Sequence, residues 1–243
     1  MDLNHIIFGL IQGATEWLPI SSSGHLLIFK HFMKLDFTIE FFIAVHLGTL
    51  FSVIIYFRRE ILEILKSIKD SKSEGFKLLI YILIGNLVTA VIALTFEEYF
   101  ERLFSEISTL PYAFIASGIL ILLSWRRKGN YGIDLKRAIV IGAFQGISII
   151  PGISRSGATI SSALILGVKA EEAFKFSFLL SIPAIIGANI FKIWNMSSLI
   201  IIPMISAFLS GYIAIYIVRK TLKRFHLFSI YCFLIGIIIW ILK

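Results

Sequence analysis

The sequence has few charged residues and a single cysteine. Of its 243 residues, 16% are charged and 58% are hydrophobic, whereas soluble domains are roughly 45–50% apolar and about 25% charged. No segment is polar enough to form a soluble domain of its own, so the composition indicates a membrane protein. The one cysteine, Cys232, excludes a disulfide within the chain and leaves the redox compartment undetermined.

Acidic residues are also scarce. The chain has 15 Asp and Glu residues against 23 Lys and Arg residues, which gives a formal net charge of +8. Because the basic residues lie in short loops between apolar runs, we expect no nucleic-acid partner. The N-terminus reads MDLNHIIFGLIQG, without a basic residue or a following cleavage site, and so does not resemble a cleaved signal peptide.

Long apolar runs account for most of the chain. Six of them are long enough to cross a bilayer, and they lie at about 39–57, 76–95, 110–125, 173–192, 198–218 and 227–242. Two further runs, at about 5–33 and 136–167, are interrupted by Pro, Gly and Ser. Because interrupted backbone cannot face lipid, each is expected to be a re-entrant helix–loop–helix, which enters and leaves on one face.

These runs define the predicted fold. We expect an all-α polytopic membrane protein, with residues 1–243 as a single transmembrane domain. The halves, approximately 1–128 and 129–243, each consist of a re-entrant hairpin followed by three transmembrane helices. Because three is an odd number, the second half lies upside down relative to the first, which is an inverted-topology repeat.

The basic loops predict the orientation. They lie at 58–77, 126–137 and 219–224, and in the six-crossing arrangement they share one face of the membrane. By the positive-inside rule this face is cytoplasmic. Both termini and the first hairpin then face the exterior, and the second hairpin enters from the cytoplasm.

One polar sequence occurs twice. Residues 11–24 read IQGATEWLPISSSG and residues 144–157 read FQGISIIPGISRSG. The matching pairs are Gln12 and Gln145, Gly13 and Gly146, Thr15 and Ser148, Ile20 and Ile153, Ser21 and Ser154, Ser23 and Ser156, and Gly24 and Gly157. The first copy carries Glu16 and the second Arg155, so the two copies have opposite charges.

Each copy is suited to bind an anion. Pro19 ends the helix before it, and the following SSSGH offers three hydroxyls, a glycine and a new helix start. Free N–H groups at a helix N-terminus bind anions, and serines add donors. In PGISRSG, the Arg155 guanidinium adds a fork of donors that matches phosphate oxygens. Two such turns meeting at their tips would form a phosphate pocket.

Three ionisable side chains are candidates for chemistry. Glu16, on the same helix face as Gln12, could accept a proton or hold a divalent cation. His25 could act as base, acid or nucleophile. Since a buried charge in a membrane needs a partner, we expect Glu16 to lie near Arg155. A purely structural ion pair and a packing turn are the alternative interpretations of these motifs. His46, Asn86 and Asn189 are expected to form interhelical hydrogen bonds.

QGATEWLPISSSGHL and PGISRSG resemble the two signature motifs of the bacterial undecaprenyl pyrophosphate phosphatase family, which is also known for bacitracin resistance. The similarity extends to EFFIAVHLGTL after the first motif and FSFLLSIPAIIGA after the second. It implies hydrolysis of undecaprenyl pyrophosphate to the monophosphate carrier of cell-wall synthesis, with Mg²⁺ or Ca²⁺ as cofactor. The implied location is the cytoplasmic membrane of a bacterium, with a polyprenyl pyrophosphate and bilayer lipid as partners.

The resemblance also implies roles for residues. Glu16, Ser22, His25 and Arg155 are the expected catalytic residues, with Glu16 as a metal ligand. The expected phosphate-binding residues are Ser21, Ser23, Gly24, Ser154, Ser156, Gly157 and Thr159, supported by Gln12 and Gln145. At one position the family carries Glu or Gln, and here it is Gln12, which removes one metal ligand or base. Bacitracin is expected to compete for the substrate without binding the protein, and a homodimer is one option for the assembly.

Our mechanistic hypothesis has Ser22 as the nucleophile, Glu16 as base or metal ligand, and His25 assisting proton transfer. Attack by His25, through a phosphohistidine, is the alternative. The rival function is a polyprenyl-phosphate flippase or another secondary transporter, because inverted repeats with broken helices are common in carriers.

Overall fold

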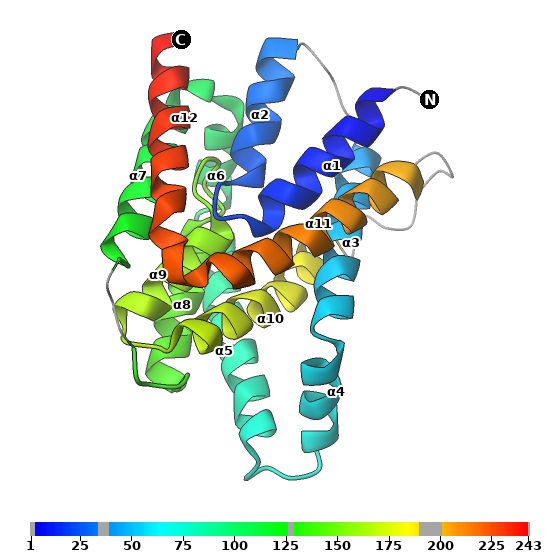
Figure 1. Cartoon of the computed structure of the whole chain (residues 1–243), viewed down its shortest axis with the longest axis vertical. Helices are drawn as coiled ribbons and strands as arrows, with labels where there is room; N and C mark the ends of the chain where they lie inside the picture. The colour runs from blue at the N-terminus through cyan, green and yellow to red at the C-terminus, as the bar shows by residue number, and fades with distance from the viewer. Residues whose placement is uncertain (1–2, 34–38, 126–128, 190–200, 243) are drawn as a thin grey trace.

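The computed structural model describes residues 3–33, 39–125, 129–189 and 201–242 (Figure 1). Throughout these ranges the regular secondary structure is helical, as the sequence predicts. Up to residue 125 the elements are α1 (Leu3–Trp17), α2 (Ser22–Met33), α3 (Ile39–Tyr56), α4 (Arg58–Ser67), α5 (Glu74–Thr95), α6 (Glu97–Ser105), the short 3-10 helix η1 (Ile107–Thr109) and α7 (Leu110–Leu123). From residue 129 they are α8 (Leu135–Ile147), α9 (Arg155–Ile165), α10 (Ala170–Asn189), α11 (Ile201–Thr221), the 3-10 helix η4 (Leu222–Leu227) and α12 (Phe228–Leu242).

Each predicted crossing coincides with a helix. These helices are α3, α5, α7, α10, α11 and α12. Two of the predicted crossings, at 173–192 and 198–218, extend into residues 190–200 and to that extent lie outside the described residues, as do residues 126–128 of the second basic loop.

The structure adds two helices that apolar length does not reveal. The helices α4 and α6 lie in stretches that the sequence indicated only as polar loops, and both are amphipathic. In α4 the buried Ile64 faces the protein, whereas Leu62 and Leu65 are exposed. A short helix with one buried face contains no long apolar run, so it is invisible to a search for membrane spans.

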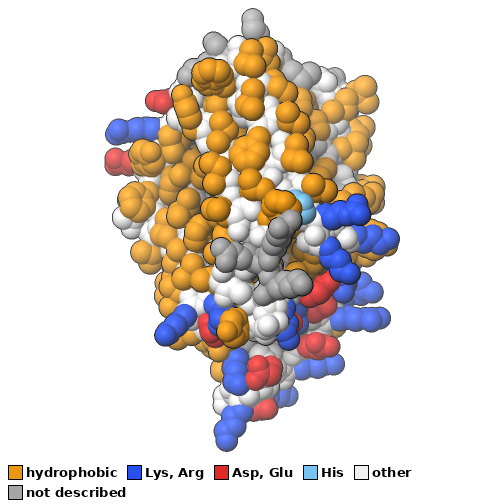
Figure 2. Space-filling model, turned by 60° about the vertical axis from the view of Figure 1, so that its left-hand side comes forward, with side chains coloured by type: hydrophobic (Ala, Val, Ile, Leu, Met, Phe, Trp, Pro, Cys, Tyr) orange, Lys and Arg blue, Asp and Glu red, His pale blue; other side chains and the backbone are white. Residues whose placement is uncertain are grey.

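The surface of the long helices is apolar. By length and composition, Glu74–Thr95 and Ile201–Leu242 could each cross a membrane, and Phe41–Tyr56 with Arg58–Ser67, bent by 73°, would be a third span if taken as one. Large apolar side chains cover much of the height of the face in Figure 2, while charged ones gather toward its lower end. Such a surface suits lipid contact. The described helices are therefore compatible with a membrane protein, and the number of six crossings stays a prediction.

Glycines allow two long helices to lie unusually close to their neighbours. On α1, a Cβ added at Gly9 or Gly13 would overlap the backbone carbonyl oxygen of Pro203 or Ala207 on α11. On α8, a Cβ at Gly142 would overlap the backbone of Gly85 on α5. Such close helix contacts through small residues are characteristic of membrane proteins.

The two polar turns meet inside the bundle. The Gly152 N–H of the second turn donates to Ser21 Oγ of the first at 3.2 Å, and Ser156 Oγ donates to the Leu18 carbonyl at 3.3 Å. In each turn a serine also accepts a bond from the N–H three residues on, at 3.3 Å for Ser21 and 3.1 Å for Ser154. The predicted contact between the turns is thus present.

Ser21 has an uncommon backbone conformation. Its φ is 67°, in the left-handed region, where a non-glycine residue costs about 1–2 kcal/mol. This conformation accompanies the bonds that its side chain accepts from both turns, so the contact between the turns stabilises the strained residue.

We predict that Gly142→Ala lowers the stability of the protein. The added methyl group would overlap the backbone of Gly85, which cannot move aside like a flexible side chain, and overpacking of this kind costs about 1–3 kcal/mol. Thermal unfolding in detergent measures the effect. Gly187→Ala in α10 is the matched control, because no atom of the described residues lies within 4 Å of its Cβ position. Equal melting temperatures for the two variants would contradict the close approach of α8 and α5.

Candidate active site

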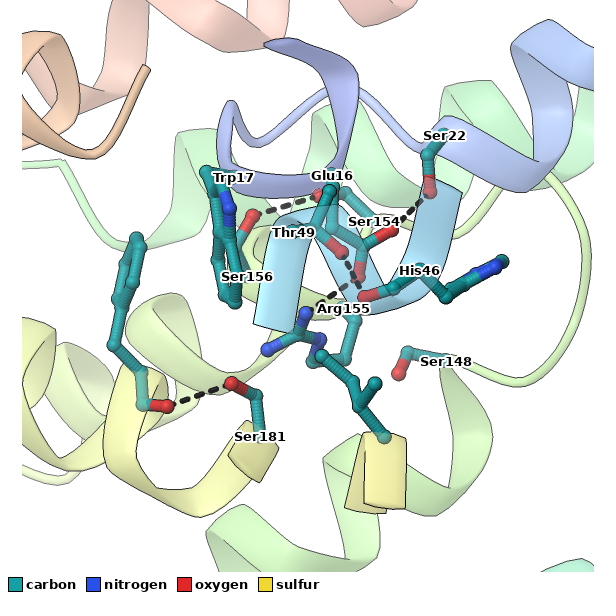
Figure 3. A network of polar contacts seen from close by, with 12 residues as sticks. Glu16, Trp17, Ser22, His46, Thr49, Ser148, Ser154, Arg155, Ser156 and Ser181 are labelled. Carbon is teal, nitrogen blue, oxygen red and sulfur yellow. Dashed lines mark hydrogen bonds and ion pairs between the residues drawn. The ribbon is translucent and has the colours of Figure 1, made fainter. Parts of the chain in front are cut away.

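Glu16 is the centre of a buried polar cluster at the end of α1 (Figure 3). Its Oε1 accepts a bond from Arg155 Nη2 at 2.6 Å, and its Oε2 accepts bonds from Ser22 Oγ at 2.7 Å and Gln12 Nε2 at 3.0 Å. The side chains of Glu16 and Arg155 are only 9% and 15% exposed. The sequence predicted that these two charges meet, and the structure confirms it.

Arg155 has a donor that the protein does not use. It is the first residue of α9, directly after the N-cap residue Ser154, and its guanidinium lies 4.9 Å from the centre of the Trp17 ring. One terminal nitrogen binds Glu16, whereas the other, Nη1, is buried and without a hydrogen-bond partner in the described part of the chain. A buried, unpaired guanidinium donor is costly unless a ligand accepts it. This donor suits a phosphate oxygen.

Trp17 is a site residue that the sequence analysis missed. It is fully buried, its indole N–H donates to Ser52 Oγ at 2.9 Å, and its ring stacks on Phe178 at 4.9 Å. The ring is therefore fixed on one face while Arg155 lies over it, a cation–π arrangement. The one signal for Trp17 in the sequence was its position directly after Glu16. The repeat did not indicate it, because the matching residue in the second copy is Ile150.

Ser22 and Ser23 take different roles in the turn. Ser22 begins α2 and points to Glu16, so its hydroxyl oxygen already has a carboxylate that can accept its proton. Ser23 lies 3.4 Å from Ser21, and Gly24 packs so closely against Phe114 that a Cβ there would overlap the ring. Of the three serines, the structure brings Ser22 to the carboxylate.

His25 is held away from Glu16. Its Nδ1 lies 2.6 Å from the Ser21 carbonyl oxygen and its Nε2 lies 2.6 Å from the hydroxyl of Tyr231 on α12. Both ring nitrogens thus have partners outside the Glu16 cluster. His46 instead lies beside that cluster, with Nε2 3.5 Å from Gln12 Nε2, which fits the predicted interhelical contact.

Most of the remaining predicted residues are bonded within the protein. Ser154 caps α9, and Ser156 bonds the first turn. Thr159 donates to the Arg155 carbonyl at 2.8 Å and lies 2.6 Å from Ser177 Oγ. Gln145 lies 3.1 Å from Thr89 and 3.4 Å from Asn86, and not in the Glu16 cluster. The structure therefore joins the side chains of Gln12, Glu16, Ser22 and Arg155, whereas Gln145 bonds Asn86 and Thr89, and Thr159 bonds the Arg155 backbone and Ser177.

A divalent cation would find few ready ligands. Among the described residues no three His, Cys, Asp or Glu side chains gather in one place. However, the Gln12 Oε1 atom is buried without a partner in the described chain, and the Nε2 atom of the same amide lies 3.0 Å from Glu16 Oε2. An amide oxygen and one carboxylate, completed by oxygens of a bound phosphate, form the kind of set that binds Mg²⁺. The residues present fit such a shared site.

The sequence profile of a family described as bacitracin resistance protein BacA matches residues 5–238. This chain belongs to that family. It is 42% identical over 256 residues to an undecaprenyl-diphosphatase of Carboxydothermus hydrogenoformans, covering 98% of this chain and 96% of that protein. It is 40% identical to the undecaprenyl-diphosphatases of Thermosipho africanus, with 97% and 98% of the two chains covered, and Korarchaeum cryptofilum, with 96% of each covered.

We predict that Arg155→Ala weakens binding of inorganic pyrophosphate by about 10- to 100-fold, the equivalent of one or two charge-assisted hydrogen bonds. Isothermal titration calorimetry of the detergent-solubilised protein measures this affinity. Arg219→Ala is the matched control, because the Arg219 side chain is 55% exposed and lies 3.5 Å from Glu171, outside the cluster. Unchanged affinity in Arg155→Ala would contradict an anion site at Nη1.

Proposed function

We propose that this protein is an integral membrane phosphatase that hydrolyses undecaprenyl pyrophosphate to undecaprenyl phosphate and phosphate. The observation that carries the proposal is the buried cluster in which one carboxylate binds both a serine hydroxyl and a guanidinium with a free donor. Full-length relatives that are named undecaprenyl-diphosphatases support the same substrate.

In the first step Ser22 Oγ attacks the terminal phosphorus. Its proton passes to Glu16 Oε2, 2.7 Å away, while the bond from phosphorus to the bridging oxygen breaks. Arg155 stabilises the charge that develops on the phosphoryl oxygens, and Glu16 returns the proton to the departing undecaprenyl phosphate. The products are a phosphoserine and the monophosphate carrier.

In the second step water attacks the phosphoserine. Glu16, again ionised, accepts a proton from the water, the Ser22 Oγ–P bond breaks, and the serine regains its proton as phosphate leaves. The bond between Ser22 and Glu16 supports Ser22 as the nucleophile. The alternative nucleophile, His25 Nε2, already lies 2.6 Å from the Tyr231 hydroxyl. His25 then assists proton transfer.

A divalent cation, Mg²⁺ or Ca²⁺, fits this reaction. Glu16 and the free Gln12 Oε1 would hold it together with substrate oxygens. When bound, it would act as a Lewis acid that neutralises phosphoryl charge.

We further propose that the two halves form an inverted repeat with re-entrant hairpins. Gly9 and Gly142 are separated by the same 133 positions as Gly13 and Gly146. Gly9 contacts α11, which is the second long helix after the hairpin of the second half. Gly142 contacts α5, which is the second long helix after the hairpin of the first half. The start of α1 and the end of α12 lie at one end of Figure 1, and the loop between α4 and α5 lies at the other.

This arrangement supports an exterior first hairpin, with both termini outside and the basic loops in the cytoplasm of a bacterial cell. A carrier that has released its load outside is left as a pyrophosphate on the outer leaflet, where such a site would act on it. Recycling of the carrier would then confer bacitracin resistance, because bacitracin would compete for the substrate. A homodimer stays a prediction of the resemblance.

We predict that the purified protein in detergent releases phosphate from undecaprenyl pyrophosphate, and that Ser22→Ala lowers the rate by at least about a thousandfold. Glu16→Gln lowers it by about 10²–10⁴-fold through loss of the base. Colorimetric phosphate release measures turnover, and mapping of the trapped phosphoprotein identifies the nucleophile.

Ser124→Ala is the matched control, because its buried hydroxyl, at the C-cap of α7, donates to the Ile121 carbonyl at 2.6 Å. Detergent removes the two compartments, so a pure flippase or transporter would release no phosphate and would contradict the proposal. Phosphate found on His25 would exchange the two roles.

We also predict that a chelator abolishes turnover and that Gln12→Glu lowers the Mg²⁺ concentration for half-maximal rate. The variant adds a second carboxylate at the position 3.0 Å from Glu16, and hard cations bind more tightly as ligand charge increases. Titration of Mg²⁺ into the metal-free protein measures the shift. Full activity in chelator would contradict a metal site at this pair.

A further inference from the structure

The imidazole of His25 is fixed on three sides. Its Nδ1 lies against the carbonyl oxygen of Ser21, its Nε2 against the hydroxyl of Tyr231, and the edge of the Phe114 ring contacts it at a centroid distance of 5.6 Å. The side chain is buried. A histidine with this many partners has one ring orientation.

The partners also determine which nitrogen carries the proton. A backbone carbonyl only accepts, so His25 Nδ1 must donate to Ser21, at 2.6 Å. In the neutral ring Nε2 is then the acceptor, and Tyr231 donates its O–H to it at 2.6 Å. A tyrosine hydroxyl can both donate and accept, so the same contact survives protonation of Nε2.

Tyr231 is itself well placed to hold the ring. It lies on α12, its ring stacks on the imidazole with 5.7 Å between centroids and 19° between planes, and it is 37% exposed. The next residue, Cys232, is buried with its Sγ 3.5 Å from the carbonyl of Pro19. Helix α12 thus contacts α2 through Tyr231 and the first turn through the next residue, Cys232.

We propose that Tyr231 is a positioning residue for the reaction. The Ser21 carbonyl holds His25 as the Nδ1–H tautomer, and the Tyr231 hydroxyl, bonded to Nε2, fixes the orientation of the ring, three residues after Ser22 in α2. The inference rests on the proposed phosphatase function. A hydrogen bond of this kind orients an active-site histidine and typically changes the rate rather than binding.

The test compares Tyr231→Phe with Tyr112→Phe. The first variant keeps the stacked ring and removes only the hydroxyl, whereas Tyr112 on α7 is 64% exposed and serves as the matched control. With undecaprenyl pyrophosphate in detergent, we expect Tyr231→Phe to lower kcat about tenfold with KM within about twofold, and Tyr112→Phe to change neither.

The double variant Tyr231→Phe/His25→Gln should be no slower than His25→Gln alone, since the tyrosine acts through the histidine. Equal kcat in Tyr231→Phe and the wild type, or effects that multiply in the double variant, would overturn the proposal.

A spectroscopic measurement does not depend on turnover. In protein with ¹⁵N-labelled histidine, the signal lost in His25→Gln identifies the ring; we expect an Nδ1–H tautomer in both the wild type and Tyr231→Phe, with the Nε2 signal shifted in the variant because its hydroxyl donor is lost. A wild-type ring protonated only on Nε2 would overturn the proposal even if Tyr231→Phe did not fold. Absence of phosphate release by the wild type would instead contradict the proposed function, and the tautomer would still be measurable.

Discussion

The contact between Glu16 and Arg155 is the interaction on which the arrangement of the two polar turns depends. Two opposite charges lie almost completely buried at 2.6 Å, and removal of either partner from such a pair leaves an uncompensated charge worth about 3–5 kcal/mol. The two residues belong to different copies of one motif, so neither turn can be placed without the other. The ion pair therefore fixes the geometry of the site as well as its charge.

The pair is only partly satisfied by the protein. Glu16 accepts bonds from Gln12, Ser22 and Arg155, and its oxygens are well supplied with donors. Arg155 has the Trp17 face and one carboxylate oxygen, and its remaining terminal nitrogen has no partner among the residues that the structure describes. This imbalance favours a binding site over a purely structural ion pair, because a pair kept only for stability would have its donors saturated.

Much of the fold follows from composition and apolar length. Stretches of about 20 apolar residues have few alternatives to a helix in a membrane, so the long helices were predictable. The Glu16–Arg155 contact was predictable as well, because a charge buried within an apolar chain needs an oppositely charged partner. The short helices α4 and α6 were not, since their periodic polar residues look like those of a loop.

The contacts of the site depend on how far each helix is rotated about its axis, and a single sequence does not specify this rotation. Tyr231 and His25 are 206 positions apart, and Tyr231 lies in an apolar run where a tyrosine has no reason to stand out. The same holds for Ser52, which fixes Trp17. The sequence thus identified the charged members of the site and missed the neutral residues that orient them.

The left-handed backbone of Ser21 has a consequence for biosynthesis. A ribosome delivers the first half of the chain to the membrane before the second half exists, and at that stage no Gly152 amide is present to bind the serine hydroxyl. Only partners within the first turn, such as the Gly24 N–H, then bond this hydroxyl, so less offsets the strain of the left-handed conformation. The geometry of the first turn is therefore completed only after the second turn has been inserted beside it.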